Sequence, residues 1–119
     1  MPGKSILIVE DDDDVRGALA VFLEAEGYVV LEASDGAAAL HELRTRSVCL
    51  VLLDLWMPGM NGWEFRAEQL KDAVLADVPV VVITADHAAG RRAADLGMSA
   101  FMTKPVEFTK LLEHVSRYC

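Results

Sequence analysis

Short apolar runs alternate along the chain with stretches in which apolar residues recur at helical spacing. Runs of four to six such residues predict strands buried on both faces, as in a parallel sheet covered by helices. The predicted strands are residues 5–9, 28–33, 48–53, 78–83 and 100–103. The pattern therefore predicts five strands, each followed by a helix.

The segments between the runs carry the end signals and apolar faces of helices. Asp13 or a neighbour can cap the first helix, Gly27 can end it, and Ser34 or Asp35 can cap the second. In the third helix, positions i, i+4, i+7 and i+11 predict an inward face. The expected inward residues are Val15, Leu19, Phe22 and Leu23; Leu40 and Leu43; Trp63, Ala67, Leu70 and Val74; Ala89, Ala93 and Leu96; Phe108, Leu111, Leu112 and Val115.

Strict alternation of strands and helices predicts an α/β fold with right-handed crossovers and helices on both faces of a parallel sheet. Five strands suit the doubly wound, flavodoxin-like order 2-1-3-4-5, whose switch point lies between the first and third strands. With 119 residues, of which 53% are hydrophobic and 25% charged, the chain is expected to form one domain over residues 1–119.

Charge and composition narrow the range of partners. The net charge of −8 would repel a phosphate backbone, so direct binding of nucleic acid is not expected. Without a membrane-length apolar run or a signal peptide, the chain is expected to be cytoplasmic. Cys49 and Cys119 have no metal-ligand spacing and are expected to be reduced. His41, His87 and His114 are scattered and are expected at the surface.

Chemically active side chains stand at the ends of four predicted strands: Glu10 and Asp11, Asp54, Thr84, and Lys104. In an open α/β sheet these ends meet at one edge, where ligands bind. Three carboxylates at this edge repel one another unless a cation joins them, and Mg²⁺ accepts carboxylate, carbonyl and water oxygens. Thr84 and Lys104 can hold the oxygens of a phosphoryl group, which leaves Asp54 as the nucleophile. Asp12, Asp13 and Asp14 are interpreted as a solvated helix cap.

Four motifs, in order, resemble those of response-regulator receiver domains. They are residues 6–12 (ILIVEDD), 52–62 (LLDLWMPGMNG), 83–85 (ITA) and 104–105 (KP), so the resemblance covers essentially the whole chain. It implies a signalling domain whose Asp54 accepts a phosphoryl group from the phosphohistidine of a sensor histidine kinase or a phosphotransfer protein. Apart from phosphorylation and dephosphorylation of its own aspartate, such a domain is not an enzyme.

The resemblance also assigns roles around the site. It implies that Mg²⁺, replaceable by Mn²⁺, is held by Asp11, Asp54 and the backbone carbonyl of Trp56, while Glu10 acts through a metal-bound water. Lys104 would pair with the phosphoryl group, and the peptide bond between Lys104 and Pro105 would be cis. Glu10 stands where aspartate is common in this family, which leaves an outer-sphere carboxylate available.

A switch is implied by the same resemblance. Thr84 and Phe101 would be the switch pair, although phenylalanine in place of the family's tyrosine offers no hydroxyl for signalling. Trp56 and Asp86 lie two residues beyond Asp54 and Thr84, at positions that adjust the lifetime of the phosphoryl group. A downstream protein would bind the fourth helix, fifth strand and fifth helix, about residues 88–117. The domain is expected to be a monomer or weak dimer.

Two other functions remain open at this stage. A small phosphatase or phosphotransferase could use Asp54 as a transient nucleophile on an external substrate, but it needs a cap or second domain to enclose that substrate. A flavin-binding module on the same fold needs a phosphate-cradling loop after the first strand, and the acids of residues 10–14 oppose bound phosphate.

Overall fold

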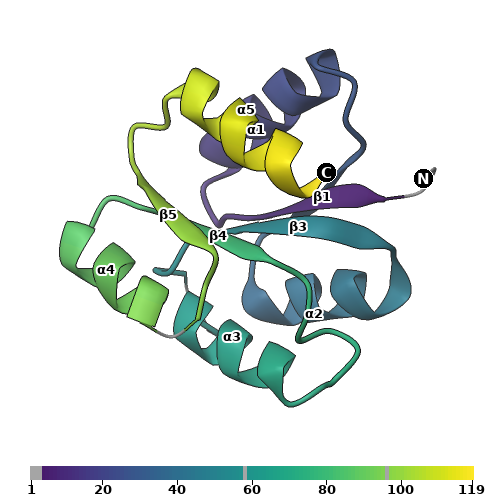
Figure 1. Ribbon diagram of the computed structural model, residues 1–119, viewed down its shortest axis with the longest axis vertical. Coiled ribbons are helices and arrows are strands. Elements are labelled where there is room, and N and C mark those ends of the chain that lie inside the picture. Colours follow the sequence, from purple (N-terminus) through teal and green to yellow (C-terminus); the bar gives the residue numbers. More distant parts are fainter. Residues whose placement is uncertain (1–3, 58, 96) are drawn as a thin grey trace.

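A parallel sheet lies between two layers of helices in the computed structural model, which describes residues 4–57, 59–95 and 97–119 (Figure 1). The strands are β1 (Ser5–Val9), β2 (Val30–Ala33), β3 (Val48–Leu53), β4 (Val80–Thr84) and β5 (Ala100–Thr103). All neighbouring strands are parallel, in the order β2-β1-β3-β4-β5. The predicted fold class and strand order are confirmed, although β2 and β4 each begin two residues later than predicted.

The helices are α1 (Asp13–Ala25), α2 (Gly36–Thr45), α3 (Gly62–Leu70), α4 (His87–Asp95) and α5 (Phe108–Tyr118). Side chains accept from free amides at the N-termini of α1, α2 and α3, and Asp86 does the same at α4. Asp12 caps α1, Asp35 caps α2, and Asn61 forms a reciprocal capping box with Glu64 in α3. Gly27, with a positive φ of 95°, follows α1 as expected.

Successive residues of the central strands point to opposite faces and so belong to two cores. Leu7 and Val51 lie in the core covered by α2, α3 and α4, whereas Ile6 and Leu50 lie in the core covered by α1 and α5. All four side chains are fully buried. This double coverage explains why the strands are apolar without alternation, and it leaves polar groups to the strand ends.

Of the predicted inward face of α3, Trp63 packs against the core, but the rest of the prediction is wrong. Leu70 is 49% exposed, and Val74, which lies beyond the end of the helix, is 82% exposed. The helix instead buries Phe65 together with two polar residues, Arg66 and Gln69. An apolar pattern gives no weight to polar side chains, so it selected the wrong face.

Hydrogen bonds explain why these polar residues are buried. Gln69 is fully buried and donates from Nε2 to the carbonyl oxygens of Leu75 and Val78, at 2.9 and 3.0 Å. Arg66 donates to Gln69 Oε1 at 2.8 Å and to the carbonyl of Gly97 at 3.1 Å. A buried polar group is tolerated when such partners replace water. The pair thus joins α3 to the segments that enter β4 and β5.

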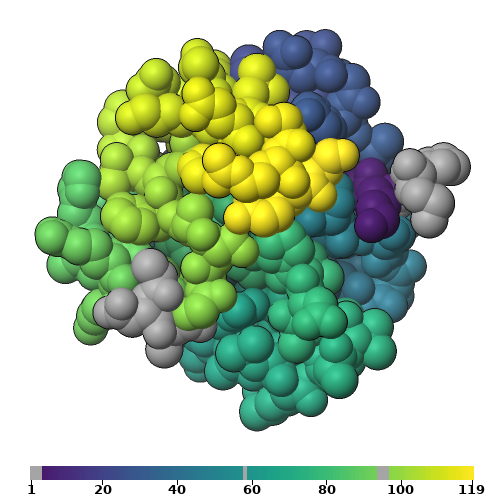
Figure 2. Space-filling view, viewed as in Figure 1, coloured from purple at the N-terminus to yellow at the C-terminus, as the bar shows by residue number. Residues whose placement is uncertain are grey.

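Cys49 and Cys119 form a disulfide, so the prediction of reduced thiols is wrong. The cysteines are 70 residues apart in sequence, but their Cα atoms lie 5.5 Å apart. The bond joins β3 to the end of α5, which lies on the same side of the sheet as α1 (Figure 1) and adjoins β5 in the space-filling view (Figure 2). Only the crossover of α5 over the sheet brings the two residues together.

His114 also differs from its prediction. His41 and His87 are exposed as expected, but His114 is half-buried in a cleft of about 300 Å³ between α4, β5 and α5. Its Nδ1 is buried and has no hydrogen-bond partner within the described part of the chain. Burial lowers the pKa of His114 below its ordinary value of 6.5, Arg117 lowers it further, and Glu113 opposes both.

A loss of stability on acidification follows from this shift. A histidine with a lowered pKa in the folded state stabilises the fold above its unfolded pKa and loses that contribution as the pH falls through 6.5. We expect His114→Gln to reduce the fall in unfolding free energy between about pH 7.5 and 5.5, measured by urea denaturation. His41→Gln is the exposed control, and an equal fall in His114→Gln and the wild type would contradict the expectation.

Candidate functional site

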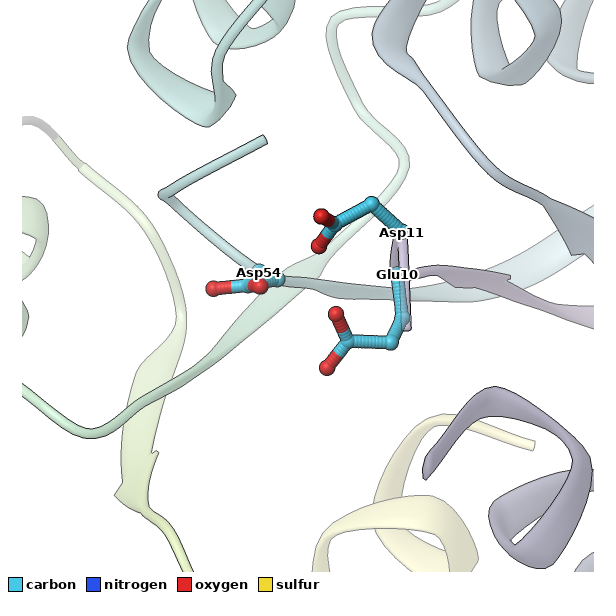
Figure 3. Close-up of side chains that lie close together, drawn as sticks. All are labelled: Glu10, Asp11 and Asp54. Carbon is cyan, nitrogen blue, oxygen red and sulfur yellow. The ribbon is translucent and has the colours of Figure 1, made fainter. Parts of the chain in front are cut away.

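Three carboxylates meet at the carboxyl edge of the sheet. Glu10 and Asp11 follow β1 and Asp54 follows β3, and the two strands are neighbours with Val9 opposite Leu53. The Asp54 N–H donates to the Val9 carbonyl at 3.0 Å, which continues the ladder to the site. One oxygen from each carboxylate lies within 4.8 Å of the others, and Figure 3 shows the side chains of Glu10 and Asp11 extending toward Asp54.

Lys104 supplies the opposite charge from the end of β5. Glu10 and Asp54 are only 3% and 7% exposed, and buried carboxylates require partners. The Lys104 ammonium lies 2.5 Å from Glu10 Oε1 and 3.4 Å from Asp54 Oδ2. The Lys104–Pro105 peptide bond is cis, as expected.

The pKa values reflect this crowding. Burial raises the pKa of Asp11, and the neighbouring carboxyl of Glu10 raises it further, while Lys104 acts in the opposite direction. Burial lowers the pKa of Lys104, but its bonds to Glu10 and its attraction to Asp54 outweigh this effect and leave the pKa above its ordinary value. The carboxylates at this edge thus contribute to both pKa shifts, although burial is the larger cause for Asp11.

The donor set fits a hard divalent cation. Three carboxylates face a single ammonium group, and their clustered oxygens are the ligands that Mg²⁺ and Mn²⁺ prefer. Trp56 is 52% exposed, and its backbone N–H donates to Asp54 Oδ1 at 3.2 Å. Ligation by its backbone carbonyl stays a prediction.

Added Mg²⁺ is expected to stabilise the fold. A cation that binds only the folded chain relieves the repulsion among Glu10, Asp11 and Asp54, and each 1 kcal/mol gained should raise the melting temperature by roughly 4 °C. Thermal unfolding with millimolar MgCl₂ or with EDTA measures the effect. Asp11→Asn should show a smaller shift, and Asp14→Asn, an exposed acid of α1, an unchanged one. Identical curves with MgCl₂ and with EDTA would count against the metal site.

Thr84 and Asp86 are joined at the start of α4. Thr84 ends β4 and is fully buried, and its hydroxyl oxygen accepts a hydrogen bond from the Asp86 N–H at 3.1 Å. The exposed carboxylate of Asp86 accepts from the N–H groups of Ala88 and Ala89, at 3.0 and 3.1 Å. Asp86 thus caps the first turn of α4, and its expected effect on phosphoryl lifetime remains a prediction.

Phe101 is half-buried in β5, opposite Val82 of β4 in the sheet register. Its ring packs against the core on the α4 side of the sheet. The structure therefore places the predicted switch pair on neighbouring strands, with Thr84 two residues beyond Val82.

Arg16 is a residue of this region that the sequence analysis missed. Its guanidinium donates to the backbone carbonyl of Glu10 at 2.8 Å, to Glu32 at 3.2 Å, and to Asp13 at 2.5 Å. Its side chain is 16% exposed. These bonds hold the loop that carries Glu10 and Asp11. An arginine in a first helical turn, where acids are favoured, is the sequence signal that could have indicated it.

Together the topology and the site define a doubly wound α/β domain with a cluster of three carboxylates at the carboxyl edge of its sheet. Residues 6–116 match the response regulator receiver domain model, so the chain belongs to this family. It is thus a receiver domain of two-component signalling, a class of generally non-enzymatic signalling domains.

Three relatives illustrate the match. PilH of Pseudomonas aeruginosa is 33% identical over 116 residues, which cover 93% of both proteins. The phosphate regulon transcriptional regulatory protein PhoB of the same organism is 35% identical over 107 residues, 88% of this chain and 47% of PhoB. The receiver domain of NtrX from Brucella abortus superposes with a TM-score of 0.87 at 30% identity, covering 96% of this chain and 97% of that one.

The share of each relative that this chain covers differs among the relatives. The chain spans about half or less of several curated relatives that it matches, PhoB among them, and nearly all of PilH.

Among the described residues, no helix is both long enough and apolar enough to cross a membrane.

Proposed function

We propose that Asp54 is the phosphoacceptor of this receiver domain and takes its phosphoryl group from the phosphohistidine of a sensor histidine kinase or a phosphotransfer protein. The observation that carries the proposal is that the Asp54 carboxylate clusters with those of Glu10 and Asp11 and lies 3.4 Å from the ammonium of Lys104, which also pairs with Glu10. The carboxylates can hold a metal ion beside a transferring phosphoryl group, and the ammonium of Lys104 can contact that group directly.

In the proposed reaction an oxygen of Asp54 attacks phosphorus, the bond from phosphorus to the donor imidazole breaks, and an acyl phosphate forms on Asp54. Lys104, 3.4 Å from the Asp54 carboxylate, is within reach of a phosphoryl oxygen. Asp11, Asp54 and the Trp56 carbonyl would hold Mg²⁺ or Mn²⁺, with Glu10 acting through water. When bound, the metal would neutralise charge on the phosphoryl oxygens. Water later hydrolyses the acyl phosphate and releases inorganic phosphate.

The signal would pass through Thr84. Its hydroxyl, which now accepts from the Asp86 N–H, would instead donate to a phosphoryl oxygen. The ring of Phe101 would change position with it. The face formed by α4, β5 and α5 would then present a different surface to a downstream protein. Because Phe101 has no hydroxyl, the change would be read through shape and packing.

The remaining expectations belong to the same proposal. Residues 1–119 would act as one domain, as a monomer or weak dimer in the cytoplasm, with no direct contact to nucleic acid and no activity on an external substrate. Within the described part of the chain, no feature favours the phosphatase or the flavin alternative.

Intact mass spectrometry tests the proposal. We expect the chain to gain one phosphoryl group when incubated with acetyl phosphate and MgCl₂, and to lose it on treatment with hydroxylamine, which cleaves acyl phosphates. EDTA in place of MgCl₂ should suppress the gain because the carboxylates then repel the donor. No gain in mass with MgCl₂, or an equal gain with EDTA, would overturn the proposal.

Trp56→Asn is expected to shorten the lifetime of the phosphoryl group. The exposed indole lies two residues beyond Asp54, and we expect its bulk to obstruct the attacking water. We expect hydrolysis to be about threefold to tenfold faster, which corresponds to a barrier lower by roughly 0.7–1.4 kcal/mol. The decay of the phosphorylated mass measures the lifetime. Trp56→Phe, which keeps an aromatic ring, should change it less, and equal lifetimes in Trp56→Asn and the wild type would refute the effect.

A further inference from the structure

Gly90 and Phe101 occupy space that a larger pair could not share. Gly90 is buried in α4, and a Cβ atom built on it would lie 2.6 Å from Cδ2 of the Phe101 ring and 3.1 Å from Cγ and Cε2. A separation of 2.6 Å is shorter than the contacts that real Cβ atoms make. The ring therefore rests directly against the backbone of α4, in a space that exists because residue 90 has no side chain.

A second helical glycine has no such close contact. Gly17 lies in α1, and a Cβ atom built there meets nothing within 4 Å. Glycine is a weaker helix former than alanine at either position. An added methyl group would therefore improve α1 without a clash, whereas in α4 it would collide with Phe101. This contrast makes Gly17 a matched control for Gly90.

Asp86 connects this contact to Thr84. The Asp86 N–H donates to the Thr84 hydroxyl at 3.1 Å, and the Asp86 carbonyl accepts from the Gly90 N–H at 3.0 Å. The Asp86 carboxylate also accepts from the Ala89 N–H at 3.1 Å. A displacement of the Thr84 hydroxyl therefore acts on the first turn of α4 at Asp86, and that turn ends at the glycine on which the ring rests.

We infer that Gly90 is a positioning residue that couples Thr84 to Phe101 through the first turn of α4, so that side-chain volume at residue 90 sets the balance between the two arrangements of the switch. This inference rests on the proposed function, in which Thr84 exchanges the Asp86 N–H for a phosphoryl oxygen. The inference adds a third residue to the switch pair of Thr84 and Phe101, because the backbone of Gly90 contacts the Phe101 ring.

The direction of the effect follows from the arrangement described here, in which Thr84 accepts from Asp86 and the ring lies against Gly90. A methyl group at residue 90 penalises this arrangement and so shifts the balance toward the other one. A shift toward the arrangement that phosphorylation favours raises the population from which Asp54 reacts, and the observed rate rises with that population. Gly90→Ala is therefore expected to accelerate phosphorylation of Asp54.

A double-mutant cycle tests the coupling. The variants are Gly90→Ala, Phe101→Ala and their combination, with Gly17→Ala as control, and the readout is the rate of phosphorylation by acetyl phosphate with MgCl₂. We expect Gly90→Ala to raise this rate about threefold to tenfold when Phe101 is present, equivalent to roughly 0.7–1.4 kcal/mol, and to leave it unchanged in the Phe101→Ala background. Gly17→Ala should leave the rate unchanged.

A second readout separates coupling from a general loss of stability. The NMR resonance of the Thr84 methyl group should shift in Gly90→Ala, return toward its wild-type position in the double variant, and stay unchanged in Gly17→Ala. If Gly90→Ala does not fold, the same comparison in a Phe101→Leu background, where the side chain is smaller, should still give a rate ratio above one.

Equal rate ratios with and without the Phe101 ring, a slower rate in Gly90→Ala, or a ratio of one in the Phe101→Leu background would each overturn the inference. Failure of the proposed function gives a different result, because the wild type itself would then take up no phosphoryl group. In that case the Thr84 resonance still tests the contact between Gly90 and Phe101.

Discussion

Asp54→Asn is expected to abolish phosphorylation of the domain. The amide oxygen of asparagine is a poor nucleophile and carries no charge, so neither the new bond nor the charge balance with Lys104 can form as proposed. Asparagine has nearly the shape of aspartate, and its Oδ1 can still accept the Trp56 N–H that Asp54 accepts at 3.2 Å. We therefore expect a folded variant whose intact mass stays unchanged after incubation with acetyl phosphate and MgCl₂.

Asp14→Asn is the control for a general effect of lost negative charge. Asp14 is exposed in the first turn of α1 and lies outside the carboxylate cluster, so this variant should be phosphorylated like the wild type. Removal of one carboxylate from the crowded edge should also reduce the stabilisation of Asp54→Asn by Mg²⁺. A variant lacking Asp54 that still gained an acid-stable or acyl phosphate in wild-type yield would place the acceptor elsewhere.

Reduction of the disulfide between Cys49 and Cys119 is expected to lower the free energy of unfolding by about 4 kcal/mol. The bond closes a loop of 70 residues, and a cross-link of that span removes much of the conformational entropy of the unfolded chain. Loss of the bond restores that entropy and so favours unfolding. Urea denaturation with and without dithiothreitol measures the difference.

Cys119→Ser is the matched variant. Cys119 is exposed, whereas Cys49 is 6% exposed, so substitution of Cys119 removes the bond without opening a cavity in the core. The variant should be as unstable as the reduced wild type and should not respond to dithiothreitol. A wild type equally stable in both redox states would contradict the expected contribution of the bond. Because α5 belongs to the proposed output face, the same samples also show whether the bond affects phosphorylation at Asp54.

Local signals in the sequence were sufficient for the scaffold and for the members of the site. The apolar run of β3 stops at Asp54 because a strand buried on both faces cannot carry a charge until it leaves the sheet. The runs before Glu10 and Lys104 end in the same way, and parallel strands bring such ends to one edge. The helix caps at Asp12 and Asp35 could be expected from the sequence for a similar reason, since a cap depends on residues within one turn.

The sequence by itself determined the strands, their order and the side chains gathered at the edge, because these depend on short-range periodicity and on general rules of chain connection. The tertiary structure decided the buried face of α3, where Gln69 finds its partners in a following segment, and the bond between Cys49 and Cys119. It also decided the contact of Phe101 with Gly90. Each of these joins groups whose proximity depends on how helices cross the sheet, and no pattern within a single segment encodes that crossing.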